Sequence, residues 1–247
     1  MILHTEKLVF IHVPKCGGTS IEYLLTRMPL LAEHSETDDV IFSENPELSK
    51  IFPLKNRHGF RSEYEAFLER GPEGSKSPYS YFTLLRDPRK VVTSQFRYRK
   101  KMSHLWKHKK NGPVRKIIRR LMYQSFLLYS LQRIWKKMIR RSLFTTHYDR
   151  FLPSYEAYLK PSDGISSTPT NVFFLEEVSE DSKRLMNWLK EKNVRAEEFP
   201  RKNVTPKTKT GPSIFHRFLV YVLVRKEIKL YEKLRYESLE RPVLFTG

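Results

Sequence analysis

Cysteine and long apolar runs are scarce in this sequence, and each scarcity excludes a class of protein. The chain of 247 residues contains 1 cysteine, Cys16, which excludes an intrachain disulfide framework and a zinc site built from several thiolates. The most apolar segment, 218–224, falls far short of the roughly 20 residues of a membrane-spanning helix. The N-terminal segment lacks the basic start and apolar centre of a signal peptide. These absences predict a soluble protein of a reducing compartment, although a luminal protein separated from its anchor would look the same.

Acidic residues are missing from one quarter of the chain. Residues 88–148 contain no Asp or Glu and 18 Lys and Arg, whereas the other 186 residues hold 28 basic and 27 acidic side chains. Nearly all of the formal net charge of +19 therefore lies in one tract. Such a tract attracts polyanions: nucleic acid, anionic lipid, phosphorylated cofactors or acidic glycans. The alternative is a solvated helical face, but ordinary surface helices mix charges of both signs.

Predicted strands and helices alternate along the chain. Apolar, β-branched and aromatic runs predict strands at 7–13, 79–85 and 171–175, with a weaker one at 143–147. Helical spacing of apolar residues predicts helices at 21–25, 62–70, 87–98, 114–139, 152–159 and 179–192, and two more segments after 212. Loops between the strands are too long for hairpins, so the order predicts an α/β fold with a parallel sheet. We expect a single domain over 1–247, with a basic, mainly helical insertion at about 100–142.

A glycine-rich loop separates the first predicted strand from its helix, and residues 13–20 read Val-Pro-Lys-Cys-Gly-Gly-Thr-Ser. Two consecutive glycines let backbone N–H groups approach an anion closely, and the helix N-terminus adds further amides. Lys15 supplies a positive charge, and the hydroxyls of Thr19 and Ser20 are further donors. The loop is not a Walker A motif, because Lys15 precedes the glycines. The pattern predicts a phosphate site without a metal, and a plain strand-to-helix turn is the alternative.

The second predicted strand also runs into a helix, through Arg86, Asp87 and Pro88. If both strands are parallel, Arg86 lies at the same sheet edge as the glycine-rich loop. Its guanidinium can hold a phosphate with two hydrogen bonds, and Ser94, about two helical turns on, offers a second donor. A local Arg86–Asp87 pair that caps the helix is the alternative.

Both segments resemble motifs of one enzyme family. Residues 10–20 resemble the 5′-phosphosulfate loop of the carbohydrate sulfotransferases that use 3′-phosphoadenosine 5′-phosphosulfate (PAPS), and residues 82–94 are similar to their 3′-phosphate motif. The resemblance is greatest to the branch with the heparan sulfate 2-O and 6-O enzymes. Fainter similarity extends to 173–176 and to 201–206, a late loop that closes over the cofactor in the family. The resemblance implies a P-loop-like three-layer fold, with a central parallel β-sheet flanked by helices.

The resemblance also implies a reaction and its residues. A sulfuryl group would pass in line from PAPS to a hydroxyl of an acceptor, with carbohydrate as the favoured class and no metal required. Lys15 would stabilise charge on the leaving phosphate. The residues expected to bind PAPS are Lys15, Cys16, Gly17, Gly18, Thr19, Ser20, Arg86, Ser94, Asn203 and Thr205. Cys16 occupies the variable position of the loop, where we expect a small space-filling side chain and no nucleophile.

A general base must remove the proton of the acceptor hydroxyl, and in this branch a histidine or a glutamate between the two motifs does so. His58 is the best candidate, because it lies between the two motifs in an Asn-Arg-His-Gly-Phe context whose His-Gly pair resembles that of the family. The unperturbed pKa of a histidine, near 6.5, also suits a base at neutral pH. A surface loop histidine is the alternative. His34 is the second choice, with Glu33 and Glu36 behind it, and His12 is expected to be structural.

Two other functions compete with sulfuryl transfer. The phosphate loop would also suit a nucleotide-dependent phosphotransferase, against which stand the position of Lys15 and the lack of a nearby magnesium-binding carboxylate. The basic helices would suit a protein that binds nucleic acid or a membrane surface. For the sulfotransferase, we expect a hydroxylated, acidic glycan as acceptor, an anionic membrane surface as a further partner, and no specific nucleic acid. A cytoplasmic bacterial or peripheral membrane enzyme is expected, or a Golgi enzyme if an anchor precedes this sequence.

Overall fold

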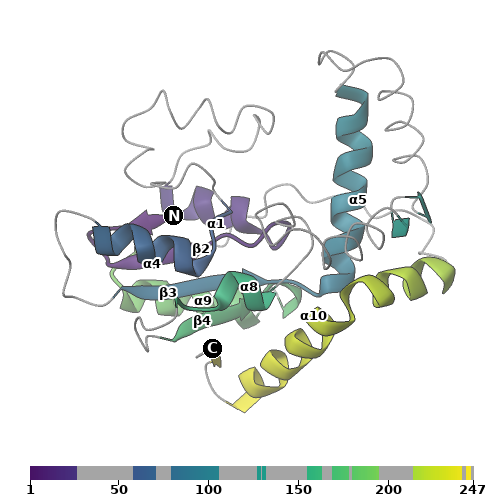
Figure 1. Cartoon of the computed structure of the whole chain (residues 1–247). Coiled ribbons are helices and arrows are strands. Elements are labelled where there is room, and N and C mark those ends of the chain that lie inside the picture. The colour runs from purple at the N-terminus through teal and green to yellow at the C-terminus, as the bar shows by residue number, and fades with distance from the viewer. Residues whose placement is uncertain are drawn as a thin grey trace. The chain divides into compact units, whose positions relative to one another are not determined.

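The computed structural model describes ten segments of the chain (Figure 1): residues 1–26, 58–70, 79–105, 127–128, 130–131, 155–162, 169–177, 180–194, 214–240 and 243–245. The chain divides into two compact units. Unit 1 comprises Met1–Asp87, Ser154–Val204 and Leu230–Gly247, and unit 2 comprises Pro88–Pro153 and Thr205–Lys229. The predicted strand at 143–147 and most of the predicted helix at 114–139 lie outside the described residues. The single domain with an insertion at about 100–142 stays a prediction.

Unit 1 is built on a five-stranded sheet with the order β1-β2-β3-β4-β5. The strands are β1 (Ile2–Leu3), β2 (Leu8–Ile11), β3 (Ser80–Leu85), β4 (Thr170–Phe174) and β5 (Val243–Phe245). The three central strands are parallel, as predicted, with Phe10 opposite Phe82 and Leu84 opposite Phe173. The sheet is nevertheless mixed, because β1 and β5 pair antiparallel at its two edges. The predicted parallel sheet is therefore confirmed for the three central strands, and the two short edge strands add antiparallel pairs that the sequence did not predict.

Helices pack against both faces of this sheet. Their bounds are α1 (Gly18–Thr26), α4 (Arg61–Arg70), α8 (Tyr155–Leu159) and α9 (Glu180–Glu191), with a 3-10 turn at Leu175–Glu177. On one face, Ile21 of α1 and Leu185 of α9 share a buried cluster with Phe10 and Phe82 of the central strands. Burial of these large apolar side chains is the main favourable term in the folding of such a unit.

A buried arginine joins α4 to the opposite face of the sheet. The Arg61 guanidinium is fully buried and donates to Glu65 Oε1 (2.8 Å) and Thr170 Oγ1 (3.1 Å). It also lies 4.7 Å from the centre of the Tyr81 ring. The second carboxylate oxygen of Glu65 accepts from the amide of Ser162 at 2.6 Å, so the charged pair is hydrogen-bonded within the core. This network fixes α4, and with it the segment that begins at His58, against the sheet.

Unit 2 contains α5 (Pro88–Leu105) and the first part of α10 (Ile214–Glu240). Val92 and Phe96 of α5 pack against Val220, Leu223 and Ile228 of α10. The sequence predicted two C-terminal helical segments, and α10 consists of two helical stretches joined by a kink at Val224, where φ and ψ leave the helical region (φ −125°, ψ 26°). None of the described helices combines the length and the apolarity needed to cross a bilayer.

Candidate functional site

The carboxyl ends of the three parallel strands place their following residues at one edge of the sheet. β2 is followed by His12 and the glycine-rich loop, β3 by Arg86 and Asp87, and β4 by Glu176. In open α/β sheets this edge is where ligands bind. The alternation of strands and helices predicted that the loop and Arg86 would meet there.

Two residues of the loop have a left-handed backbone. Gly17 has φ +85° and Lys15 has φ +65°. A residue with a Cβ is sterically strained at positive φ, so the backbone of Lys15 is strained and that of Gly17 is not. Alternation of left-handed and right-handed residues turns successive amides toward one side, which is the geometry of anion-binding nests. The loop therefore has the backbone expected of an anion site, and one of its left-handed residues is a lysine and not a second glycine.

The second glycine is required for a different reason. Gly18 begins α1, and a Cβ built on it would lie 2.0 Å from Cδ2 and from Nε2 of His12. No side chain can occupy that space while the ring stays in place. The two glycines are therefore not equivalent: Gly17 is needed for its φ and Gly18 for the close approach of His12.

His12 is held by a buried carboxylate. Its Nδ1 lies 2.6 Å from Oε1 of Glu22 in α1, and both side chains are almost wholly inaccessible to solvent. The ring also stacks on Phe10, with the ring centres 5.7 Å apart. The pair joins the end of β2 to α1 across the loop, which agrees with the structural role expected of His12.

His58, the predicted base, lies against the same strand end. Its Nδ1 is 3.2 Å from the carbonyl oxygen of His12, and the two rings meet edge to face with centres 4.3 Å apart. A carbonyl oxygen can only accept, so Nδ1 carries the proton of this hydrogen bond. In the neutral ring Nε2 is then the basic nitrogen.

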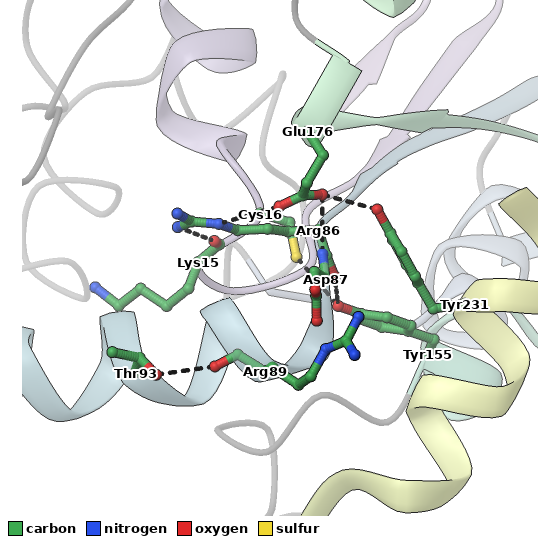
Figure 2. Close-up of polar contacts among 9 residues, drawn as sticks. All are labelled: Lys15, Cys16, Arg86, Asp87, Arg89, Thr93, Tyr155, Glu176 and Tyr231. Atoms are coloured by element: carbon green, nitrogen blue, oxygen red, sulfur yellow. Dashed lines mark hydrogen bonds and ion pairs between the residues drawn. The ribbon is translucent and has the colours of Figure 1, made fainter. Parts of the chain in front are cut away.

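Lys15 and Arg86 are brought together, as predicted. Arg86 Nη1 donates to the carbonyl oxygen of Lys15 at 3.5 Å, and Figure 2 shows the two cationic side chains extending to the same side. This contact connects the two predicted phosphate-binding segments, which lie 71 residues apart in the chain. It also supports the left-handed residue of the loop.

Glu176, in the turn that follows β4, orients the side chain of Arg86. Its Oε1 lies 3.7 Å from Nε of Arg86, and its Oε2 accepts from the Asp87 amide at 2.9 Å and from the Tyr231 hydroxyl at 2.8 Å (Figure 2). Burial and the Glu176 carboxylate raise the pKa of Tyr231, so this hydroxyl keeps its proton and donates. The ion pair that the structure describes for Arg86 is the one with Glu176, and a local Arg86–Asp87 pair that caps the helix stays a prediction.

Cys16 is a buried, neutral thiol. It is inaccessible to solvent, and burial raises its pKa to about 12. Its Sγ lies 3.9 Å from the hydroxyl of Tyr155, which donates to the carbonyl of Arg86. A thiol this far from ionisation is a poor nucleophile, in agreement with the space-filling role expected for it.

The remaining predicted residues divide between described and undescribed parts of the chain. Thr19 and Ser20 lie in the first turn of α1, and the amide of Ser20 bonds to the Gly17 carbonyl at 2.9 Å. Ser94 lies in α5 of unit 2, so its partnership with Arg86 stays a prediction. The other predicted positions lie outside the described residues: Glu33, His34, Glu36, Asn203 and Thr205.

Sequence reasoning assigned no role to the residues that support Arg86, although Glu176 lies in the faint similarity at 173–176. Glu176 had a usable signal, because it follows the third parallel strand and so had to reach the same edge. Tyr155 and Tyr231 had none, since nothing in their local sequence distinguishes them from other helical tyrosines that pack in a core. Within the described residues no group of three His, Cys, Asp or Glu side chains gathers as a metal site would.

Comparison with known protein families gives a match over most of the chain. The chain belongs to the sulfotransferase family, which matches residues 1–233. It is therefore a transferase of sulfuryl groups, as the two motifs implied. Searches among curated proteins and among solved structures gave no match.

Proposed function

We propose that this enzyme transfers the sulfuryl group of PAPS to a hydroxyl of a carbohydrate acceptor. The observation that carries the proposal is the contact of Arg86 with the Lys15 carbonyl, which unites two cationic segments at one sheet edge. A ligand with phosphate groups at two ends, such as adenosine 3′,5′-bisphosphate, suits two such segments. We also propose that the fold is P-loop-like and carries a basic insertion at about 100–142.

The predicted site residues would divide the tasks of the transfer among them. The acceptor oxygen forms a bond to sulfur while the bond from sulfur to the bridging oxygen breaks, and adenosine 3′,5′-bisphosphate leaves. Negative charge grows on the leaving phosphate, where Lys15 and the loop amides would stabilise it. Arg86, oriented by Glu176, would hold the 3′-phosphate, with Ser94, Asn203 and Thr205 as its proposed further contacts.

His58 is the proposed general base, which accepts the proton of the acceptor hydroxyl. Its Nδ1 is committed to the His12 carbonyl, so Nε2 is the nitrogen that can accept a proton. The His58 ring would then carry a positive charge. It bonds to the His12 carbonyl, and the His12 ring bonds in turn to the buried Glu22 carboxylate, so His12 connects the new charge to a negative one. An acceptor screen over neutral and acidic glycans would identify the hydroxyl that is sulfated.

The test of the site is a pair of substitutions. Lys15→Ala and Arg86→Ala should each lower the rate of sulfuryl transfer by about 100-fold or more, the usual loss when one donor to a developing negative charge is removed. Binding of adenosine 3′,5′-bisphosphate, measured by calorimetry, should weaken in both. Lys183→Ala and Arg70→Ala, exposed cations elsewhere in unit 1, are the matched controls and should behave as wild type.

Two results would contradict the proposal. Wild-type turnover in both site variants would show that Lys15 and Arg86 take no part in the transfer. Stabilisation of the protein by ATP with magnesium, and not by adenosine 3′,5′-bisphosphate, would favour the phosphotransferase instead, because a ligand raises the melting temperature only when it binds the native state.

A further inference from the structure

The first part of α10 is apolar on two faces. One face is buried in unit 2 against Val92 and Phe96 of α5. Its buried members are Leu219, Val220, Leu223, Val224 and Ile228. A surface helix normally has one apolar stripe and a polar remainder, so a second apolar face requires its own explanation.

The second face is exposed. Ile214 is 85 % exposed, Phe218 59 % and Phe215 56 %, and Tyr221 and Val222 are each 44 % exposed. Ile214, Phe218 and Val222 follow one another at intervals of four residues, so they lie on one side of the helix. Single exposed apolar residues are ordinary, whereas a row of large ones marks a surface that contacts something apolar.

The exposed polar residues beside this row are all cationic, and Glu227, the one carboxylate between Ile214 and Lys229, is only partly exposed. Between Ile214 and Lys229 nine residues are exposed: the five apolar ones above and Arg217, Arg225, Lys226 and Lys229. Unit 2 as a whole contains 25 Lys and Arg against 2 Asp and Glu, whereas unit 1 contains 21 against 25. The charge of the molecule is therefore concentrated in the unit that presents the apolar row.

We propose that this face of α10, Ile214 to Lys229, docks the enzyme on an anionic lipid bilayer. Aromatic and aliphatic side chains would enter the boundary between headgroups and acyl chains, while the arginines and lysines contact anionic headgroups. Nucleic acid and acidic glycans satisfy the cations but offer no apolar layer for Ile214, Phe218 and Val222. A bilayer satisfies both, and docking of this kind goes beyond the transfer reaction and does not depend on it.

The test measures cosedimentation of the full chain with vesicles of phosphatidylcholine alone or with about a third phosphatidylserine. Wild type should bind the anionic vesicles and leave the neutral ones largely free. Phe215→Ser with Phe218→Ser should weaken binding to anionic vesicles by about tenfold or more, since apolar insertion is lost. Arg225→Gln with Lys226→Gln should weaken it by about 25-fold, at roughly fivefold for each cation near the surface.

Matched variants test whether position matters. Tyr236→Ser removes an exposed aromatic residue from the same helix but from unit 1, and Lys190→Gln removes an exposed cation from α9. Both should bind vesicles as wild type does. All variants should keep the wild-type melting temperature, because every substituted side chain is exposed.

Three outcomes would overturn the proposal. Full binding by the double phenylalanine variant would show that the apolar row does not enter the bilayer. Tighter binding to duplex DNA than to anionic vesicles, unaffected by loss of the phenylalanines, would identify a nucleic-acid surface. A dimer in sedimentation velocity that becomes monomeric in the phenylalanine variant would mean that the row is covered by a second copy of the chain.

Discussion

The histidine pair at the end of β2 shows how single side chains divide the work of the site. His12 is buried and paired with Glu22, and its carbonyl oxygen accepts the hydrogen bond of His58 while the two rings meet edge to face. That oxygen fixes which nitrogen of His58 carries a proton, in the manner of the acceptors that orient histidines in catalytic and metal sites. The sequence identified His58 as the base candidate from its position between two motifs. It could not show the partner that sets the tautomer, because a hydrogen bond to a backbone carbonyl 46 residues away leaves no local pattern.

His58→Ala should therefore lower the rate of transfer by between about 100-fold and 10,000-fold, the range for loss of a general base. Binding of adenosine 3′,5′-bisphosphate should be unchanged, and the acidic limb of the pH profile should disappear. His4→Ala, an exposed histidine in unit 1, is the control. Unchanged turnover in His58→Ala would show that another group between the motifs is the general base.

At the scale of elements, the central strands were predictable and the edges were not. Continuous apolar runs of strand length predicted β2, β3 and β4 to within about two residues at each end. Ile2–Leu3 and Val243–Phe245 are too short to show a period, and each becomes a strand only by pairing with a neighbour already in the sheet. The glycine-rich loop was predictable as an anion site, but the reason for its second glycine was not, because Gly18 is required by the His12 ring, which packs from the end of the preceding strand.

These separate reasons predict different responses to alanine. Gly18→Ala should destabilise the protein by about 1–3 kcal/mol, as overpacked buried sites do, because the new Cβ meets the His12 ring. Gly17→Ala should cost about 1–2 kcal/mol, because alanine is strained at φ +85°. Chemical unfolding of each variant measures both costs.

A second background separates the two causes. In His12→Ala the ring is gone, so the additional cost of Gly18→Ala should largely vanish, whereas that of Gly17→Ala should persist. Equal additional costs for the two glycines in this background would show that Gly18 is also required for its backbone conformation.

The molecule as a whole keeps several weak acids neutral inside unit 1. Burial raises the pKa of Cys16 to about 12, and it raises the pKa values of Tyr81, Tyr155 and Tyr231 as well. In the unfolded chain the same groups lose their protons near their ordinary values of about 8.5 for Cys and about 10 for Tyr. Between those values and the raised ones the folded protein holds more protons than the unfolded chain, so stability falls as pH rises.

The free energy of unfolding should therefore be flat near pH 7–8 and decline above about pH 9, with a Cys16 contribution that approaches about 1.4 kcal/mol per pH unit. Urea unfolding at a series of pH values measures this decline. Cys16→Ser replaces the titrating thiol with a hydroxyl that can still bond to Tyr155, so the free energy of unfolding of this variant should decline less steeply with pH. A stability that stays constant up to pH 10.5, or a Cys16→Ser variant with the wild-type slope, would contradict the buried neutral state.

The hydrogen bond from Arg86 to the Lys15 carbonyl has a consequence for how mutational energies are assigned. Arg86 stabilises a lysine whose backbone φ is positive, so Arg86→Ala removes one cation and also releases the strained backbone of another. Losses from the two single variants will overlap, and the double variant should lose less than their product. Affinity for a doubly phosphorylated ligand thus belongs to the coupled pair and cannot be divided between two independent anchors.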